Sequence, residues 1–184
     1  MNERASRTVG RVTLECVVGD ITRQEDMDAV VNAANAQLRT GGGVAGAIHR
    51  AAGAGLAAEA RPLAPIAPGE AVVTSGHDLP NRWVIHCLGP VYGRDRPEDE
   101  LLASCYAEAL ARAGEREMES VAFPAISTGA FGYPMDEAAR IAMGTVVERA
   151  PEHESLRRIR FVLFDEPAWA AHAKALERAV PKQG

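Results

Sequence analysis

The sequence of 184 residues contains very little lysine, and this scarcity argues against several kinds of chemistry. Lys174 and Lys182 are its only two lysines, and both lie near the C-terminus. The chain therefore lacks the lysine of a phosphate-binding P-loop, and a Schiff-base lysine is disfavoured. The formal net charge of −5 at pH 7 argues against general nucleic-acid binding, because affinity for phosphate backbones depends on clustered basic residues.

Cysteines are also few, and no metal-binding motif is present. Cys16, Cys87 and Cys105 form no C-x-x-C pair, so we expect buried thiols in a reducing compartment. No H-E-x-x-H spacing occurs, which predicts no metal site and leaves four histidines as surface or structural residues: His77, His86, His153 and His172. The charged N-terminal stretch lacks the apolar core of a signal peptide, and no apolar run approaches the roughly 20 residues that span a bilayer. We therefore expect a cytoplasmic protein without a membrane partner.

The order of apolar segments predicts a single α/β domain spanning residues 1–184. Hydrophobic residues make up 47% of the chain, enough for one sizeable core. Short apolar runs predict strands at 11–18, 28–35, 70–76, 82–89, 120–127 and 158–164. Helices are predicted at 44–53, 97–114, 135–150 and 167–180, with a proline-rich loop at 62–70. This alternation is typical of a three-layer α/β/α sandwich with a central, largely parallel or mixed sheet.

Two loops rich in glycine and small polar residues follow buried strands, at 32–46 and 127–132. Ligands of open α/β sheets bind outside the carboxyl ends of the strands, so we expect both loops to open into one crevice. Gly41, Gly43 and Gly46 match the dinucleotide spacing G-x-G-x-x-G, but the nine residues NAANAQLRT separate Gly41 from the apolar run that ends at Val31, and a Rossmann fingerprint tolerates no such gap. Glycines before a helix nevertheless favour a bound phosphate, the alternative being a turn without a ligand.

Four motifs together resemble the successive signatures of the macrodomains: GDIT at 19–22, VVNAAN at 30–35, GGGVAGAIHRAAG at 41–53 and FPAISTGAFGYP at 123–134. They occur in the family's order, and the resemblance covers essentially the whole chain. The resemblance implies that ADP-ribose binds in a crevice above a mixed sheet, and several members of the family hydrolyse ADP-ribosyl derivatives. It implies no cofactor.

The resemblance also implies a role for individual residues. Asp20 and the Ile21 backbone would bind the adenine amino group, and Phe164 would stack on the base. Asn35 would bind the distal ribose. The diphosphate would lie between Gly42, Gly43 and Val44 on one side and Ser127, Thr128, Gly129, Ala130 and Phe131 on the other, with Phe131 near the distal ribose. From the residues alone, Asp20 could equally cap a turn, Phe164 could be a core aromatic, Asp165 could cap the next turn, and Asn32 is expected to be structural.

The main departure from the family concerns Ala45. In the hydrolase branch with the sequence GGVDGAIH, an aspartate implicated in catalysis stands at this position. His49 lies one helical turn later and is retained, but alanine can neither orient a water molecule nor accept a proton. The catalytic residues are therefore left open, with Asn35 and His49 as candidates.

The leading functional hypothesis is a module that binds ADP-ribose in free, acetylated or protein-linked form, and hydrolysis of ADP-ribosyl esters by the same site is left open. The alternatives are an O-acetyl-ADP-ribose deacetylase, an ADP-ribose 1″-phosphate phosphatase and, more remotely, a reader of poly(ADP-ribose) or RNA. The basic stretch at 157–160 is interpreted as a solvated strand edge rather than a nucleic-acid patch. The oligomeric state is left open.

Overall fold

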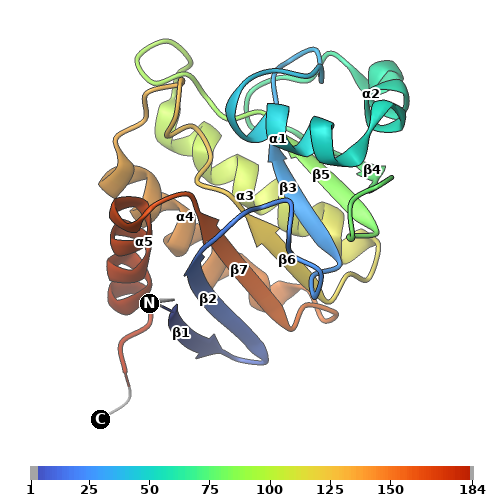
Figure 1. Ribbon diagram of the computed structural model, residues 1–184. Coiled ribbons are helices and arrows are strands. Elements are labelled where there is room, and N and C mark those ends of the chain that lie inside the picture. The colour runs from blue at the N-terminus through green and yellow to red at the C-terminus, as the bar shows by residue number, and fades with distance from the viewer. Residues whose placement is uncertain (1–3, 183–184) are drawn as a thin grey trace.

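Seven strands form one mixed sheet at the centre of the structure, a computed structural model that describes residues 4–182 (Figure 1). The strands lie in the order β1-β2-β7-β6-β3-β5-β4. Each of the inner five runs parallel to its inner neighbours, whereas β1 and β4 pair antiparallel at the two edges. Their bounds are Arg4–Val9 (β1), Val12–Val18 (β2), Ala29–Ala33 (β3), Ala71–Ser75 (β4), Trp83–Cys87 (β5), Ser120–Phe123 (β6) and Arg158–Leu163 (β7).

Helices cover both faces of this sheet (Figure 1). One face packs against α3 (Glu98–Glu115), α4 (Met135–Arg149) and α5 (Glu166–Ala179), and the other against α1 (Gly43–Ala52) and α2 (Ala54–Ala60). Short 3-10 helices span Arg61–Leu63 and Ala150–Glu152. The predicted three-layer α/β/α fold with a mixed sheet is therefore confirmed.

Side chains along the inner strands point alternately to the two faces of the sheet, which explains why a layer of helices is needed on each face. Successive side chains of a strand point to opposite faces, so a strand that is apolar throughout has two faces to bury. In β3, Val30 packs in the cluster that includes Ile48 of α1, whereas Val31 packs in the larger cluster beneath α3, α4 and α5. The inner strands are consequently fixed from both sides, and their carboxyl ends form a rigid edge on which loops can be placed.

Some sequence predictions need correction. The edge strand β1 was not predicted, and the alanine-rich stretch after Gly53 forms the separate helix α2. The interpretation of residues 157–160 as a solvated edge is wrong for Arg160, which is only 5% exposed. Its strand, β7, lies inside the sheet between β2 and β6, and the buried Glu15 and the exposed Asp26 compensate its charge.

The three cysteines are buried, and so are His86 and His172, two of the four histidines that we expect to be surface or structural residues. Cys16, Cys87 and Cys105 are free, and burial raises the pKa of the Cys16 thiol to about 12. The Nδ1 atom of His172 lies 2.8 Å from the main-chain oxygen of Ala168. Among residues 4–182, no helix is both long and apolar enough to cross a membrane.

Candidate functional site

A cavity of about 390 Å³ lies at the carboxyl ends of the inner strands. The two glycine-rich loops both contribute to it, because β3 and β6, from which they emerge, are neighbours in the sheet. The prediction that they share one crevice is thus confirmed. The lining residues are all uncharged: Ala33, Ala34, Asn35, Gly41, Gly42, Gly43, Val44, Ala45, Gly89, Ala125, Ile126, Ser127, Gly129, Ala130 and Phe131.

The first loop leads directly into the N-terminus of α1. Gly42 is the N-cap residue, and no side chain caps this end of the helix. The first turn also carries no acidic residue that would occupy the exposed N–H groups. Gly43 has φ +54°, a left-handed conformation that favours glycine. This helix end therefore presents free N–H groups and a positive dipole to the cavity, which suits an anion.

The second loop is held in shape by its own hydrogen bonds. The amide of Tyr133 donates to the Ser127 oxygen at 2.9 Å, and the amide of Gly132 donates to the Gly129 oxygen at 3.0 Å. Ser127 adopts φ +68°, and its buried hydroxyl has no partner among the described residues. The Thr128 hydroxyl instead donates to the Ala125 oxygen at 2.9 Å, and Thr128 does not line the cavity. The loop thus exposes mainly backbone and small side chains.

Gly89 completes the cavity and was missed at the sequence level. It follows β5, which is the neighbour of β3 in the sheet. A Cβ atom here would lie 2.1 Å from the Ser127 Oγ atom, so only glycine allows this approach. The sequence does show a glycine at the end of the predicted strand 82–89. It could be assigned to the site only once the structure showed that β5 lies beside β3.

Asp20, Ile21 and Phe164 lie outside this cavity, next to one another at the ends of β2 and β7. The amide of Gly19 donates to the Leu163 oxygen at 3.0 Å, which brings the segments carrying Asp20 and Phe164 together. Phe164 is 92% exposed and is therefore not a core aromatic. Ile21 is buried against the α1 side of the sheet. The three residues assigned to adenine therefore share one region.

The Asp20 carboxylate stabilises a local turn. Its Oδ1 atom accepts hydrogen bonds from the Thr22 amide at 2.9 Å and from the Thr22 hydroxyl at 2.6 Å. These bonds lower the pKa of Asp20, which keeps the group ionised. The turn-capping alternative is thus part of its role, and the exposed carboxylate retains acceptor capacity at Oδ2. Asp165 likewise caps α5, because its Oδ1 atom accepts from the Ala168 amide at 3.0 Å.

Asn35 lines the cavity and closes its own loop. Its Nδ2 atom donates to the Arg39 oxygen at 2.8 Å, and its Oδ1 atom accepts from the Arg39 amide at 3.0 Å. Each of these amide atoms retains capacity for one further hydrogen bond. The side chain is therefore already oriented at the edge of the cavity.

The model of the Macro domain family matches residues 31–142. The chain belongs to the macrodomain family. An O-acetyl-ADP-ribose deacetylase of Klebsiella pneumoniae is 47% identical over 167 residues, which cover 88% of this macrodomain and 95% of that protein.

Solved structures with bound nucleotides are also similar to this macrodomain. The Oceanobacillus iheyensis macrodomain with ADP has a TM-score of 0.91 at 38% identity, and the alignment covers 97% of each chain. The Trypanosoma brucei macrodomain in complex with ADP-ribose has a TM-score of 0.83 at 36% identity, covering 89% of this chain and 68% of the other.

The positions of Ala45 and His49 limit the chemistry of this macrodomain. Ala45 lines the cavity, but its methyl group carries no acid or base. His49 is 6% exposed, does not line the cavity, and its Nε2 atom has no partner among the described residues. Burial lowers the pKa of His49, which favours the neutral ring. Neither residue offers a proton acceptor to a ligand in the cavity.

Asn32 and His86 form a separate buried pair beneath the site. The Asn32 Nδ2 atom lies 3.0 Å from His86 Nδ1, and the Thr74 hydroxyl lies 2.9 Å from His86 Nε2. Burial lowers the pKa of His86 to about 4. These contacts agree with the structural roles expected of Asn32 and His86.

Proposed function

We propose that this macrodomain binds ADP-ribose and its derivatives, whether free, acetylated or attached to a protein. The observation that carries the proposal is the single uncharged cavity between two glycine-rich loops, one of which opens the uncapped N-terminus of α1. Such a site binds phosphates through N–H groups and helix dipoles rather than through lysine, which suits a chain with two lysines. The bound ADP and ADP-ribose of the two solved relatives support the same ligand class.

The diphosphate would contact both loops, through Gly42, Gly43 and Val44 on one side and Ser127, Gly129, Ala130 and Phe131 on the other. Thr128 would contribute only its backbone, because its hydroxyl is engaged within the loop. Asn35 would use its remaining hydrogen-bonding capacity for the distal ribose. Asp20 would accept a hydrogen bond from the adenine amino group, and Phe164 would cover the base, a stacking contact of about 1–3 kcal/mol.

Calorimetric titration with ADP-ribose, in buffer containing EDTA, tests this function. We expect one-to-one binding that is tighter than that of AMP or NAD, because neither ligand satisfies all three regions of the site. AMP lacks the second phosphate and ribose, and NAD carries nicotinamide on the distal ribose. Absence of both heat and thermal stabilisation at millimolar ADP-ribose would reject the proposal.

We propose deacetylation of O-acetyl-ADP-ribose, or hydrolysis of a related ADP-ribosyl ester, as a second candidate function. The relative named as an O-acetyl-ADP-ribose deacetylase supports it. Since Ala45 supplies no proton acceptor, turnover here would rely on a water molecule positioned by the loops and the substrate itself. A single-turnover assay with O-acetyl-ADP-ribose would separate the candidates, since a pure binding module releases the ester unchanged.

A further inference from the structure

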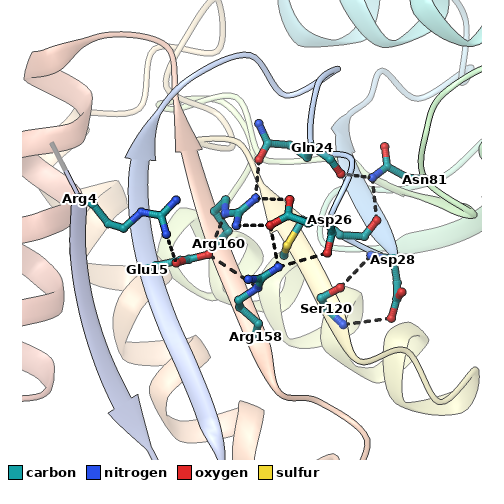
Figure 2. Close-up of polar contacts among 10 residues, drawn as sticks. Arg4, Glu15, Gln24, Asp26, Asp28, Asn81, Ser120, Arg158 and Arg160 are labelled. Atoms are coloured by element: carbon teal, nitrogen blue, oxygen red, sulfur yellow. Dashed lines mark hydrogen bonds and ion pairs between the residues drawn. The ribbon is translucent and has the colours of Figure 1, made fainter. Parts of the chain in front are cut away.

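A buried arginine lies at the centre of a cluster of ion pairs and hydrogen bonds that joins β2, β7 and the loop after β2 (Figure 2). Arg160 of β7 donates from Nε to Glu15 Oε1 at 2.7 Å. Its Nη1 and Nη2 atoms donate to the two carboxylate oxygens of Asp26, at 2.8 and 2.7 Å. Because the guanidinium is planar and bonded on several sides, its position is fixed relative to the sheet.

Gln24 connects this cluster to the residue assigned to adenine. Its Oε1 atom accepts a hydrogen bond from Arg160 Nη1 at 2.8 Å. Its Nε2 atom donates to the main-chain oxygen of Asp20 at 2.7 Å. Gln24 is 7% exposed, so both bonds are largely shielded from water. The Gln24 side chain thus connects the guanidinium of Arg160 in the sheet to the main chain of Asp20.

Other contacts hold the same loop without involving the Gln24 side chain. Asn81 donates from Nδ2 to the main-chain oxygens of Gln24 and Met27, at 2.7 and 2.8 Å (Figure 2). Asp28 accepts from the Ser120 amide at 3.2 Å. The far half of the loop is therefore anchored independently. The Gln24 amide adds a link from Arg160 to the turn that carries Asp20, beside the main-chain bond between Gly19 and Leu163.

We infer that Gln24 is a positioning residue for base recognition: its side chain holds the Asp20 turn in register with β7, and so sets the preference for adenine. The inference rests on the proposed function, and it concerns a residue that touches no ligand. Adenine presents an amino group to the Asp20 carboxylate, whereas hypoxanthine presents a carbonyl oxygen there. Discrimination between the two bases therefore depends on where the carboxylate lies.

Two substitutions test the two hydrogen bonds of the Gln24 side chain. Gln24→Glu keeps an acceptor for Arg160 but replaces the donor to the Asp20 oxygen with a carboxylate oxygen. Gln24→Met keeps the length of the side chain and removes both bonds without adding charge. Glu25→Gln is the control, because Glu25 is an exposed neighbour on the same loop. If either Gln24 variant fails to fold, the other still tests the inference.

The readout is the ratio of the dissociation constants for ADP-ribose and its hypoxanthine counterpart, measured by calorimetry. In the wild type this ratio should favour adenine by about tenfold or more, as expected for a hydrogen bond to a charged group. Both Gln24 variants should reduce the preference about three- to tenfold, the loss expected for one misaligned bond. Glu25→Gln should retain it.

Amide hydrogen exchange gives a second readout that needs no ligand. The amides of Thr22 and Arg23 donate to Oδ1 and to the main-chain oxygen of Asp20, so both should exchange faster in the Gln24 variants. The Met27 amide donates to the main-chain oxygen of Gln24 at 3.1 Å and should be unaffected.

The outcomes distinguish the inference from the proposed function. If the wild type binds ADP-ribose but folded Gln24 variants keep the full preference for adenine, the inference is overturned. Equal weakening of both ligands would also overturn it, since that result indicates a general structural role. A wild type that binds ADP-ribose without preferring adenine would remove Asp20, and with it Gln24, from base recognition. No binding of ADP-ribose by the wild type would instead reject the proposed function itself.

Discussion

Replacing Gly42 with glutamate should weaken ADP-ribose binding through charge rather than through backbone strain. Gly42 has φ −87° and ψ −177°, an extended conformation that any residue adopts. A Cβ atom at this position would meet no other atom within 4 Å. Gly43 is a poorer choice, because its φ of +54° would strain any replacement and confuse loss of binding with loss of stability. Gly42 therefore allows the cavity to be altered while the fold stays intact.

The expected magnitude follows from the position of Gly42 at the wall of the cavity. Two unit charges about 4 Å apart interact by about 4 kcal/mol at an effective dielectric constant of about 20. A flexible glutamate can turn partly toward solvent and would retain about half of that repulsion against the diphosphate. We expect a loss of about 2 kcal/mol, which corresponds to roughly thirtyfold weaker binding.

The matched control is Gly42→Gln, which has the same size and shape but no charge. Calorimetry should show Gly42→Glu binding ADP-ribose roughly thirtyfold more weakly than Gly42→Gln at low salt. Raising the ionic strength from about 0.05 M to about 0.5 M should narrow this gap, because salt screens partly exposed charges. If the two variants bind equally at both salt concentrations, the diphosphate does not lie beside Gly42, and the assignment of the first loop is wrong.

Three further predictions address other parts of the molecule. Asp20→Asn should weaken ADP-ribose binding about tenfold and reduce the preference for adenine over hypoxanthine, which calorimetry with both ligands would measure. Ala45→Asp should raise ester hydrolysis on the order of 10²-fold by adding a positioned proton acceptor, as single-turnover assays would reveal; a slower variant would refute this. The pKa of His86 is lowered by burial from 6.5 to about 4. As the pH falls, this imidazole is therefore protonated in the unfolded chain before it is protonated in the folded chain. Its contribution to the free energy of unfolding should be fully present above pH 6.5, and about 3 kcal/mol should be lost as the pH falls toward 4. Denaturant titrations across this range, with NMR of the imidazole ring, would check the sign and the midpoint.

The two loops of the cavity could be predicted from sequence because each depends on local signals. A buried apolar run followed by small polar residues marks the carboxyl end of an inner strand, as at VVNAAN and FPAIS. The glycines that follow have a local physical meaning, since Gly43 requires a positive φ. The fold class follows from the same alternation of strands and helices. The edge strand β1 escaped prediction because its alternating, half-exposed side chains include no buried run.

Features that depend on contacts between residues far apart in the sequence could not be predicted from local sequence patterns. Arg160 lies 145 residues from Glu15 and 134 from Asp26, and a run of arginines in isolation indicates an exposed surface. Only the position of β7 inside the sheet turns this arginine into a buried anchor. Gly89 is similar, because the need for a glycine arises from Ser127, which approaches from a different loop. Loops with the composition of a binding site can therefore be recognised in the sequence, whereas the contacts that hold their residues in place cannot.

Neither Ala45 nor His49 of α1 places a general base in the cavity. A general base must reach the proton that it removes, either directly or through one water molecule. His49 is buried and does not line the cavity, and burial lowers its pKa. The free N–H groups at the start of α1 would bind the diphosphate equally in the bound substrate and in the transition state, because the ester reacts away from the phosphates; such uniform binding raises affinity without accelerating the reaction. We therefore expect any hydrolysis by this macrodomain to depend on how the loops and the substrate position a water molecule, and Ala45→Asp would add a proton acceptor to that arrangement.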